Sequence, residues 1–271
     1  MSYKQNTPIH IERIVDLAKA KNIKIKYLTA IKMDKFTGDR PHNGLVLKSE
    51  SRDYLFVKSF DAFKTILQKP KGNFFILLDQ IVDPQNLGSI IRTAFYLGTD
   101  GILLNKNNKP PLGATVCKVS SGASECLDLY SLKSVKTFLA EAISNGWTVA
   151  TTSIEKESDV QMRTNQQNVN RRDLGDAIPR SFSPVISKRI SLEEFTVSRD
   201  SNVIVVLGSE ANGIVSDLSG LSNYNIYIPP KLDKNRIGKH PFDIIDSLNV
   251  GVSAGIIINH VKSNLKFNKC K

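Results

Sequence analysis

Residues 74–98 read FFILLDQIVDPQNLGSIIRTAFYLG, and this stretch decides the fold. Its first five residues are all apolar, which is typical of a short strand buried on both faces of a sheet. Asp83 followed by Pro84 is typical of a helix N-terminus. Apolar residues then recur at helical spacing until Gly98, which is typical of a helix end. The stretch therefore predicts a buried strand that leads directly into an amphipathic helix.

The same alternation of strand and helix continues along the chain. Apolar runs predict further strands at 101–104, 147–152, 203–207 and 226–228, and helices at 135–144 and 252–261. Strands that alternate with helices predict an α/β fold with a mostly parallel sheet. Residues 155–200 interrupt this pattern with Gln, Asn, Arg and Ser, so we expect a long loop or partly disordered insertion there.

The N-terminal part of the chain is strongly basic. Residues 1–72 contain 15 Lys and Arg against 7 Asp and Glu, a net charge of +8 out of +11 for all 271 residues. The pattern predicts a helix at 9–20 and strands at 23–28 and 45–47, hence a small α/β unit that ends near residue 70. A basic module on a nearly neutral body favours binding to a polyanion, and the alternative is a merely solvated lysine-rich surface.

Several classes of protein do not fit the composition and motifs. No apolar run reaches the ~20 residues of a membrane span, and the three cysteines lack the pairing of a zinc site. Gly208 and Gly213 have the glycine spacing of a phosphate-binding P-loop, but Ile214 stands where its lysine should be. The four histidines form no H-E-x-x-H motif. Metal, P-loop and membrane functions are therefore disfavoured.

Polar residues follow several of the predicted strands. Asp79, Asp83, Asn86 and Arg92 come after the first strand, and residues 208–213 read GSEANG after the strand at 203–207. In parallel sheets, ligands bind beyond the carboxyl ends of the strands. These residues therefore predict a site of Asn, Arg, Glu, Ser and backbone groups at that edge.

Three ordered motifs carry a family resemblance. DPQNLGSIIRTA at 83–94, LGSEANG at 207–213, and Ile228-Pro229 followed by SLNV at 247–250 resemble the motifs of the SpoU family of S-adenosylmethionine-dependent RNA ribose 2′-O-methyltransferases. The likeness covers residues 74–262. RPHNGLV at 40–46 resembles the closing strand of the family's ribosomal-protein-like RNA-binding domain, whose earlier elements we expect to lie upstream of this chain.

The resemblance implies an α/β, trefoil-knotted, parallel-sheet methyltransferase domain at 71–271, behind a small, incomplete N-terminal RNA-binding domain at 1–70. It implies S-adenosylmethionine as cofactor, RNA as substrate, and a homodimer in which both subunits complete each site, without a metal or a membrane. Within the family, the likeness is to enzymes that methylate a guanosine ribose in mitochondrial large-subunit ribosomal RNA, which implies a mitochondrial location.

The resemblance also assigns roles to individual residues. The backbone of the cofactor-binding set would hold S-adenosylmethionine, and this set is Thr151, Leu207, Gly208, Ile228, Pro230 and Leu248. The catalytic set is Asn86, Arg92, Glu210, Ser247 and Asn249. Because a guanidinium stays protonated in proteins, we expect Arg92 to hold a phosphate, with the ribose proton passing to that phosphate or to Glu210.

The chain departs from the family pattern at three places. The insertions at 155–200 and 231–246 are long, and Gly251 replaces the usual serine. The alternatives are a catalytically silent RNA-binding protein of the same fold, a tRNA 2′-O-methyltransferase, and a base methyltransferase of another knotted family.

Overall fold

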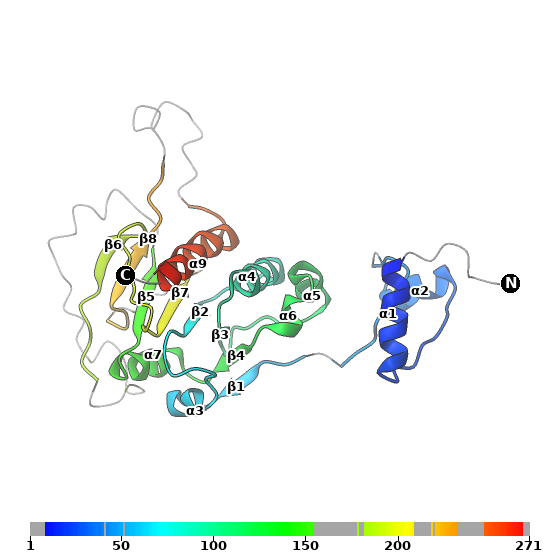
Figure 1. Cartoon of the computed structure of the whole chain (residues 1–271), viewed down its shortest axis with the longest axis horizontal. Helices are drawn as coiled ribbons and strands as arrows, with labels where there is room; N and C mark the ends of the chain where they lie inside the picture. Colours follow the sequence, from blue (N-terminus) through cyan, green and yellow to red (C-terminus); the bar gives the residue numbers. More distant parts are fainter. Residues whose placement is uncertain are drawn as a thin grey trace. The chain divides into compact units, whose positions relative to one another are not determined.

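The computed structural model describes residues 9–40, 42–50, 52–153, 178, 182–208, 218, 220–231 and 247–267. The chain forms two compact units, Met1–Glu50 and Ser51–Lys271 (Figure 1).

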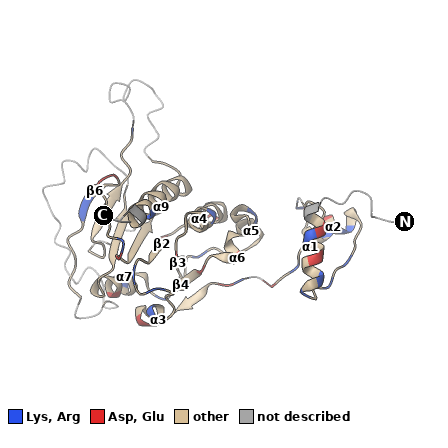
Figure 2. Ribbon diagram, in the orientation of Figure 1, with Lys and Arg blue, Asp and Glu red and all other residues tan. Residues whose placement is uncertain are grey.

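The described part of the first unit contains two helices joined and followed by irregular segments. Its helices are α1, Ile9–Ala20, which confirms the predicted helix, and α2, Ala30–Thr37, which ends at Gly38 in the left-handed conformation. Basic and acidic residues alternate along α1 (Figure 2). The predicted strands at 23–28 and 45–47 are wrong, since both segments are irregular. Alternating lysines mimicked a strand, but the described part of this unit has no partner strand to pair with the backbone.

The second unit is built on one parallel sheet of eight strands, in the order β1-β4-β3-β2-β7-β5-β8-β6 (Figure 1). The strands are β1 Leu55–Val57, β2 Phe74–Leu78, β3 Gly101–Asn105, β4 Leu129–Leu132, β5 Thr148–Thr152, β6 Lys188–Ser191, β7 Val203–Leu207 and β8 Tyr224–Tyr227. All seven strand pairings are parallel. The predicted α/β fold with a parallel sheet is therefore confirmed.

Helices cover both faces of this sheet. They are α3 Phe60–Thr65, α4 Pro84–Leu97, α5 Ala114–Ser120, α6 Ala123–Cys126, α7 Val135–Ser144 and α9 Val250–Phe267. Successive residues of β2 point to opposite faces, so Ile76 packs in the core shared with α4, α5 and α9, whereas Leu77 packs in the core shared with α3 and α7. Every residue of β2 and of β7 is buried, which explains their unbroken apolar sequences.

The division between the units lies at Glu50 and Ser51, some twenty residues before the predicted boundary at 70. β1 pairs with β4 at the edge of the sheet, and Phe60 and Phe63 of α3 are fully buried within an aromatic cluster on one face. A strand of three residues and a helix of six are too short to show a periodic pattern, so the sequence did not predict either element.

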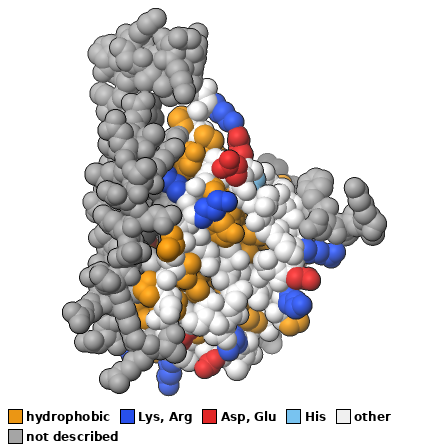
Figure 3. All heavy atoms as spheres, turned by 90° about the vertical axis from the view of Figure 1, so that its left-hand side faces the viewer, with side chains coloured by type: hydrophobic (Ala, Val, Ile, Leu, Met, Phe, Trp, Pro, Cys, Tyr) orange, Lys and Arg blue, Asp and Glu red, His pale blue; other side chains and the backbone are white. Residues whose placement is uncertain are grey.

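Part of the predicted loop at 155–200 is ordered as well, because β6 pairs with β8 at the far edge of the sheet. The end of the molecule that carries β6 faces the viewer in Figure 3, where hydrophobic side chains lie at the surface between isolated charged ones. Residues 154–177 and 232–246, which hold half of the first predicted insertion and nearly all of the second, lie outside the described residues. None of the described helices is long and apolar enough to cross a lipid bilayer. The expected knot stays a prediction.

Candidate active site

The carboxyl ends of β2, β7, β5 and β8, which are neighbours in the sheet, form one continuous row, called here the carboxyl edge. Leu78 of β2 is in register with Leu207 of β7, and Thr151 of β5 is in register with Val206 of β7. Beyond the strands, the Asp79 amide donates to the Leu207 carbonyl over 2.9 Å. The segment after β2 therefore remains hydrogen-bonded to the end of β7 beyond the last paired residues of the two strands.

Three of the predicted cofactor-binding residues, Leu207, Gly208 and Ile228, lie at this edge. Gly208 directly follows β7 and Ile228 directly follows β8, and β5 lies between these two strands. Since neighbouring strands are about 4.8 Å apart, roughly 10 Å separates the two strand ends. That span suits a small molecule held by backbone groups from both strands.

Thr151 is tied into the sheet by its side chain. It is 5% exposed, and its hydroxyl lies 3.2 Å from the Tyr224 carbonyl oxygen and 3.2 Å from the Ser222 hydroxyl oxygen. The hydroxyl thus joins β5 to the start of β8. Any contact of Thr151 with a ligand would have to come from its backbone.

Two helices begin close together at the same edge, and a hydrogen bond joins a residue in the first turn of α4 to the residue before α9. Asp83 caps α4 by accepting from the backbone N–H groups of Gln85 and Asn86, over 3.1 and 3.2 Å. At the start of α9, the Asn249 Oδ1 accepts from the Gly251 N–H over 2.9 Å. The Asn249 Nδ2 then donates to the Asn86 Oδ1 over 3.1 Å. Predicted catalytic residues 163 positions apart are therefore in contact.

This contact also fixes the orientation of the Asn86 amide. Its oxygen accepts from Asn249, so its Nδ2 faces away from that bond, and no acceptor for it occurs among the described residues. A side-chain amide nitrogen has two protons to donate. Asn86 therefore presents a hydrogen-bond donor at the edge of the sheet.

Small residues bring α4 and α9 close together behind this pair. A Cβ at Gly251 would lie 3.1 Å from Ser89 Oγ and 3.1 Å from Asn249 Oδ1, and a Cβ at Gly255 would lie 3.5 Å from Thr93 Cγ2. The glycine at position 251, where the family usually has a serine, thus allows α9 to approach α4 closely. Ser89 was not among the predicted site residues, although it lies inside the first motif.

Arg92 does not join this cluster within one chain. It lies six residues after Asn86 on α4, which is about 9 Å along the helix axis and about 120° around it. Its side chain is exposed, beside Phe95 and Tyr96, which are 47% and 87% exposed. The structure therefore separates the two predicted catalytic residues of the first motif.

The remaining predicted residues lie close to segments that the structure does not describe. Glu210 lies outside the described residues. Ser247 and Leu248 come immediately before Asn249, Leu248 is 45% exposed, and Pro230 is exposed three residues after β8. Their contacts with a ligand stay predictions.

Two polar residues stand directly after β2: Asp79, which the sequence predicted at this edge without a specific role, and Gln80, which it did not single out. The Asp79 side chain is buried, with 7% exposed, and Gln80 has a φ of 58°, a conformation that non-glycine residues seldom adopt. Their signal in the sequence was a polar pair that follows five apolar residues. Groups of three or more possible metal ligands are absent among the described residues.

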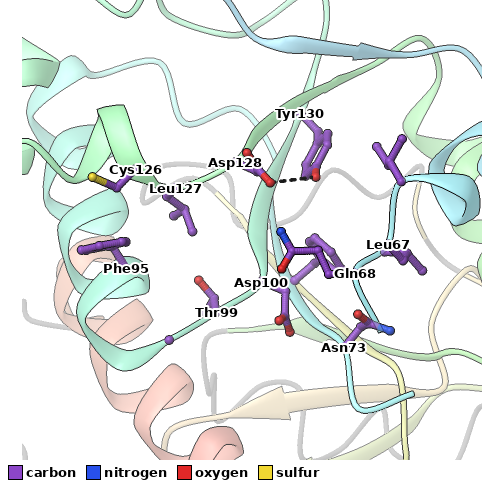
Figure 4. Close-up of a pocket in the computed structure, with 13 residues that line it drawn as sticks. Leu67, Gln68, Asn73, Phe95, Thr99, Asp100, Cys126, Leu127, Asp128 and Tyr130 are labelled. Atoms are coloured by element: carbon purple, nitrogen blue, oxygen red, sulfur yellow. Dashed lines mark hydrogen bonds between the residues drawn. The ribbon is translucent and has the colours of Figure 1, made fainter. Parts of the chain in front are cut away.

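A separate cavity of about 250 Å³ lies at the amino ends of the strands, opposite the carboxyl edge (Figure 4). Asn73, Asp100 and Asp128, which line it, directly precede β2, β3 and β4. The Tyr130 hydroxyl donates to the Asp128 carboxylate over 3.3 Å, as the dashed line in Figure 4 marks. This cavity is distinct from the edge that holds Asn86 and Asn249.

Comparison with known proteins gives a match to the SpoU rRNA Methylase family over residues 73–259. The chain is 30% identical to "rRNA methyltransferase 1, mitochondrial" of Schizosaccharomyces pombe, over 94% of this chain and 80% of that protein. It is 25% identical to the protein of the same name from Dictyostelium discoideum, of which it spans 45%. It is also 28% identical to a tRNA/rRNA methyltransferase of Borreliella burgdorferi, over 97% of both chains.

The fold has a solved counterpart in the AdoMet-bound rRNA methyltransferase of Sinorhizobium meliloti. The TM-score is 0.61 at 16% identity, over 94% of this chain and 78% of that one. This likeness shows a shared fold.

Proposed function

Because the chain belongs to the SpoU rRNA Methylase family, we propose that it transfers a methyl group from S-adenosylmethionine to the 2′-oxygen of a ribose in RNA. The observation that carries the proposal is the hydrogen bond between Asn86 and Asn249. It joins the first and third family motifs at the carboxyl edge of a parallel sheet, which is where such sheets bind ligands.

The residues at this edge fit S-adenosylmethionine. Gly208 has no side chain, so the backbone after β7 is open to close approach, and Leu248 offers a half-exposed apolar surface near the start of α9. Backbone groups of Leu207, Gly208, Ile228, Pro230 and Leu248 would hold it. When bound, it supplies a methyl group on a positively charged sulfur, which is a good leaving group.

The chain's own residues act mainly by positioning the weak nucleophile. The Asn86 Nδ2, whose amide is oriented by Asn249, would donate to an oxygen of the target ribose or its phosphate. Arg92 would hold a phosphate by charge-assisted hydrogen bonds. As the oxygen–carbon bond forms and the sulfur–carbon bond breaks, the 2′-hydroxyl proton would pass to that phosphate or to Glu210.

The separation of Arg92 from Asn86 supports the expected homodimer. Exposed apolar side chains lie on both helices of the α4 and α9 pair, and they are Phe95, Tyr96, Val252 and Ile256. Such a surface suits burial against a second copy. A dimer through these helices would supply Arg92 from one subunit to the Asn86 of the other.

The substrate that the relatives favour is ribosomal RNA of mitochondria. Relatives in Dictyostelium discoideum, Saccharomyces cerevisiae and Schizosaccharomyces pombe carry the name "rRNA methyltransferase 1, mitochondrial", and this supports the same RNA and location here. A guanosine target follows from the family resemblance alone. A tRNA substrate is the second candidate, because the Borreliella relative of equal length is named for tRNA and rRNA.

The test is methyl transfer from labelled S-adenosylmethionine to total RNA, followed by alkaline hydrolysis and mapping of the resistant linkages. We expect label in alkali-resistant dinucleotides of large-subunit ribosomal RNA. Label in bases would contradict ribose methylation, and label in tRNA would favour the second candidate. A catalytically silent RNA-binding protein would give no label and, in calorimetry, no heat of cofactor binding.

A further inference from the structure

Three exposed lysines stand in a row on the carboxyl edge of the sheet. Lys58 is the first residue after β1, Lys133 the first after β4, and Lys106 the first after β3. These strands are neighbours in the order β1-β4-β3. Their last residues are in register, because Val57 pairs with Leu132 and Leu132 pairs with Asn105. The register therefore places the three lysine backbones side by side.

Backbone hydrogen bonds hold this arrangement past the ends of the strands. The Lys133 N–H donates to the Val57 carbonyl over 3.4 Å, and the Lys106 N–H donates to the Leu132 carbonyl over 3.0 Å. With about 4.8 Å between neighbouring strands, the three Cα atoms span roughly 10 Å. The row is thus set by the rigid sheet and not by a loop.

The charges of the row are not neutralised by neighbouring carboxylates. All three side chains are exposed, and none forms an ion pair with another described residue. The carboxylates nearby in sequence have other partners, since Asp61 pairs with Lys64 and Asp53 with Lys109. The Glu141 carboxylate, near the end of the row, accepts from the Phe60 N–H.

An aromatic ring fixes the inner end of the row. The Lys106 ammonium lies 4.9 Å from the centroid of the Phe56 ring, and Phe56 is 48% exposed on the edge strand β1. A cation held over an aromatic face loses less freedom when it binds an anion. Tyr54, directly before β1, has the Lys109 ammonium 4.2 Å from its ring centroid in the same way.

The row leads directly to the site. β3 is the neighbour of β2, and Leu104, Leu78 and Leu207 are in register across β3, β2 and β7. Lys106 therefore stands one strand from the turn after β2 and two strands from Gly208. We propose that Lys58, Lys133 and Lys106 bind consecutive phosphates of the RNA strand that leads to the target ribose; this rests on the proposed function.

The test compares RNA binding by two full-length triple variants that lose the same charge. The row variant carries Lys58→Gln, Lys106→Gln and Lys133→Gln. The control carries Lys71→Gln, Lys118→Gln and Lys188→Gln, whose side chains are also exposed but lie before β2, on α5 and at the start of β6. The probe is a fluorescein-labelled RNA hairpin, titrated by anisotropy between about 0.05 and 0.2 M KCl.

We expect the row variant to bind about tenfold to a hundredfold more weakly at about 0.1 M KCl, with the slope of log Kd against log[KCl] reduced by about 2. Arginine at the same three positions should keep the wild-type slope. The control variant should keep both values nearly unchanged. Equal weakening of the two glutamine variants, or none in either, would overturn the proposal.

Binding of S-adenosylmethionine, followed by calorimetry, separates this proposal from the proposed function. The row variant should bind the cofactor as the wild type does. If the wild type binds RNA through the three lysines but transfers no methyl group, the proposed methyl transfer is refuted and RNA binding by the lysines is still supported. If the wild type transfers a methyl group but the row variant keeps the wild-type slope of log Kd against log[KCl], the proposed function is supported and phosphate binding by the three lysines is refuted.

Discussion

At the scale of single residues, the most informative contact is the one between Asn86 and Asn249. The sequence could predict that both belong to one site, because each stands in a family motif. It could not predict that one amide orients the other, since that depends on how two helix starts meet in space. The same limit applies to Arg92, because the sequence does not show which face of α4 is turned toward solvent.

The Asn86 amide gives the first prediction. Asn86→Asp keeps an acceptor for the Asn249 Nδ2 but removes the donor that faces the site. We expect unchanged thermal unfolding and a loss of methyl transfer of about a hundredfold or more, which is typical of a lost oriented donor. Single-turnover transfer to RNA measures it, with Gln85→Glu on the same helix turn as control. Full activity of Asn86→Asp would refute the donor role.

Tyr130 gives a prediction on pH. Burial, together with the nearby Asp128 carboxylate, raises the pKa of Tyr130 to about 12, against about 10 in an unfolded chain. The raised pKa stabilises the folded state below pH ~10, and this contribution is lost as pH rises toward about 12. At pH ~11 the cost is about 1 kcal/mol after allowance for solvent screening.

The measurement is urea unfolding as a function of pH. Tyr130→Phe should lose less stability than the wild type between about pH 10 and pH 12. Tyr27→Phe, at a residue that is 84% exposed in the first unit, serves as control and should follow the wild type. Parallel curves for all three proteins would speak against a raised pKa at Tyr130.

At the scale of elements, α4 was the helix most fully specified by the sequence. Its cap, its proline at the first turn, its apolar spacing and its terminal glycine all agree, and the structure confirms Pro84–Leu97 between Asp83 and Gly98. α2, α3, α5 and α6 were not predicted, because none exceeds eight residues and short helices show little periodicity. Their stability depends on packing that only the fold supplies.

The cap of α4 carries the next prediction. Asp83→Ala removes the acceptor for the Gln85 and Asn86 N–H groups, so we expect a loss of about 1 kcal/mol in the free energy of unfolding. Asp83→Asn retains an acceptor and should cost only a few tenths of a kcal/mol. Urea denaturation measures both variants. If the asparagine variant is as unstable as the alanine variant, the side chain stabilises the protein by some means other than capping.

At the scale of the whole molecule, the sequence predicted a parallel α/β sheet but not the order of its strands. Apolar runs mark strands one at a time, whereas strand order depends on crossovers between distant segments. The edge strand β1 was missed because its three residues are too few to show a pattern. The predicted catalytic residues Asn86 and Arg92, which one chain separates, raise a further question at this scale, which is whether two copies bring them together.

Complementation of two inactive variants answers that question. Asn86→Asp and Arg92→Ala should each lose methyl transfer, but if each site takes Asn86 from one subunit and Arg92 from the other, a mixed dimer has one intact site. Random exchange of subunits should then restore about one quarter of the wild-type rate. Sites contained within one subunit would give no recovery, and each variant mixed with itself is the control.

The strand order has a consequence for synthesis of the chain. β7, at residues 203–207, lies between β2 and β5, so strands made early cannot complete their pairing until a late segment has left the ribosome. Contacts between such distant segments slow folding. Until then β2 presents an apolar, unpaired edge that favours aggregation. We therefore expect the nascent chain to depend on chaperones until β7 has left the ribosome.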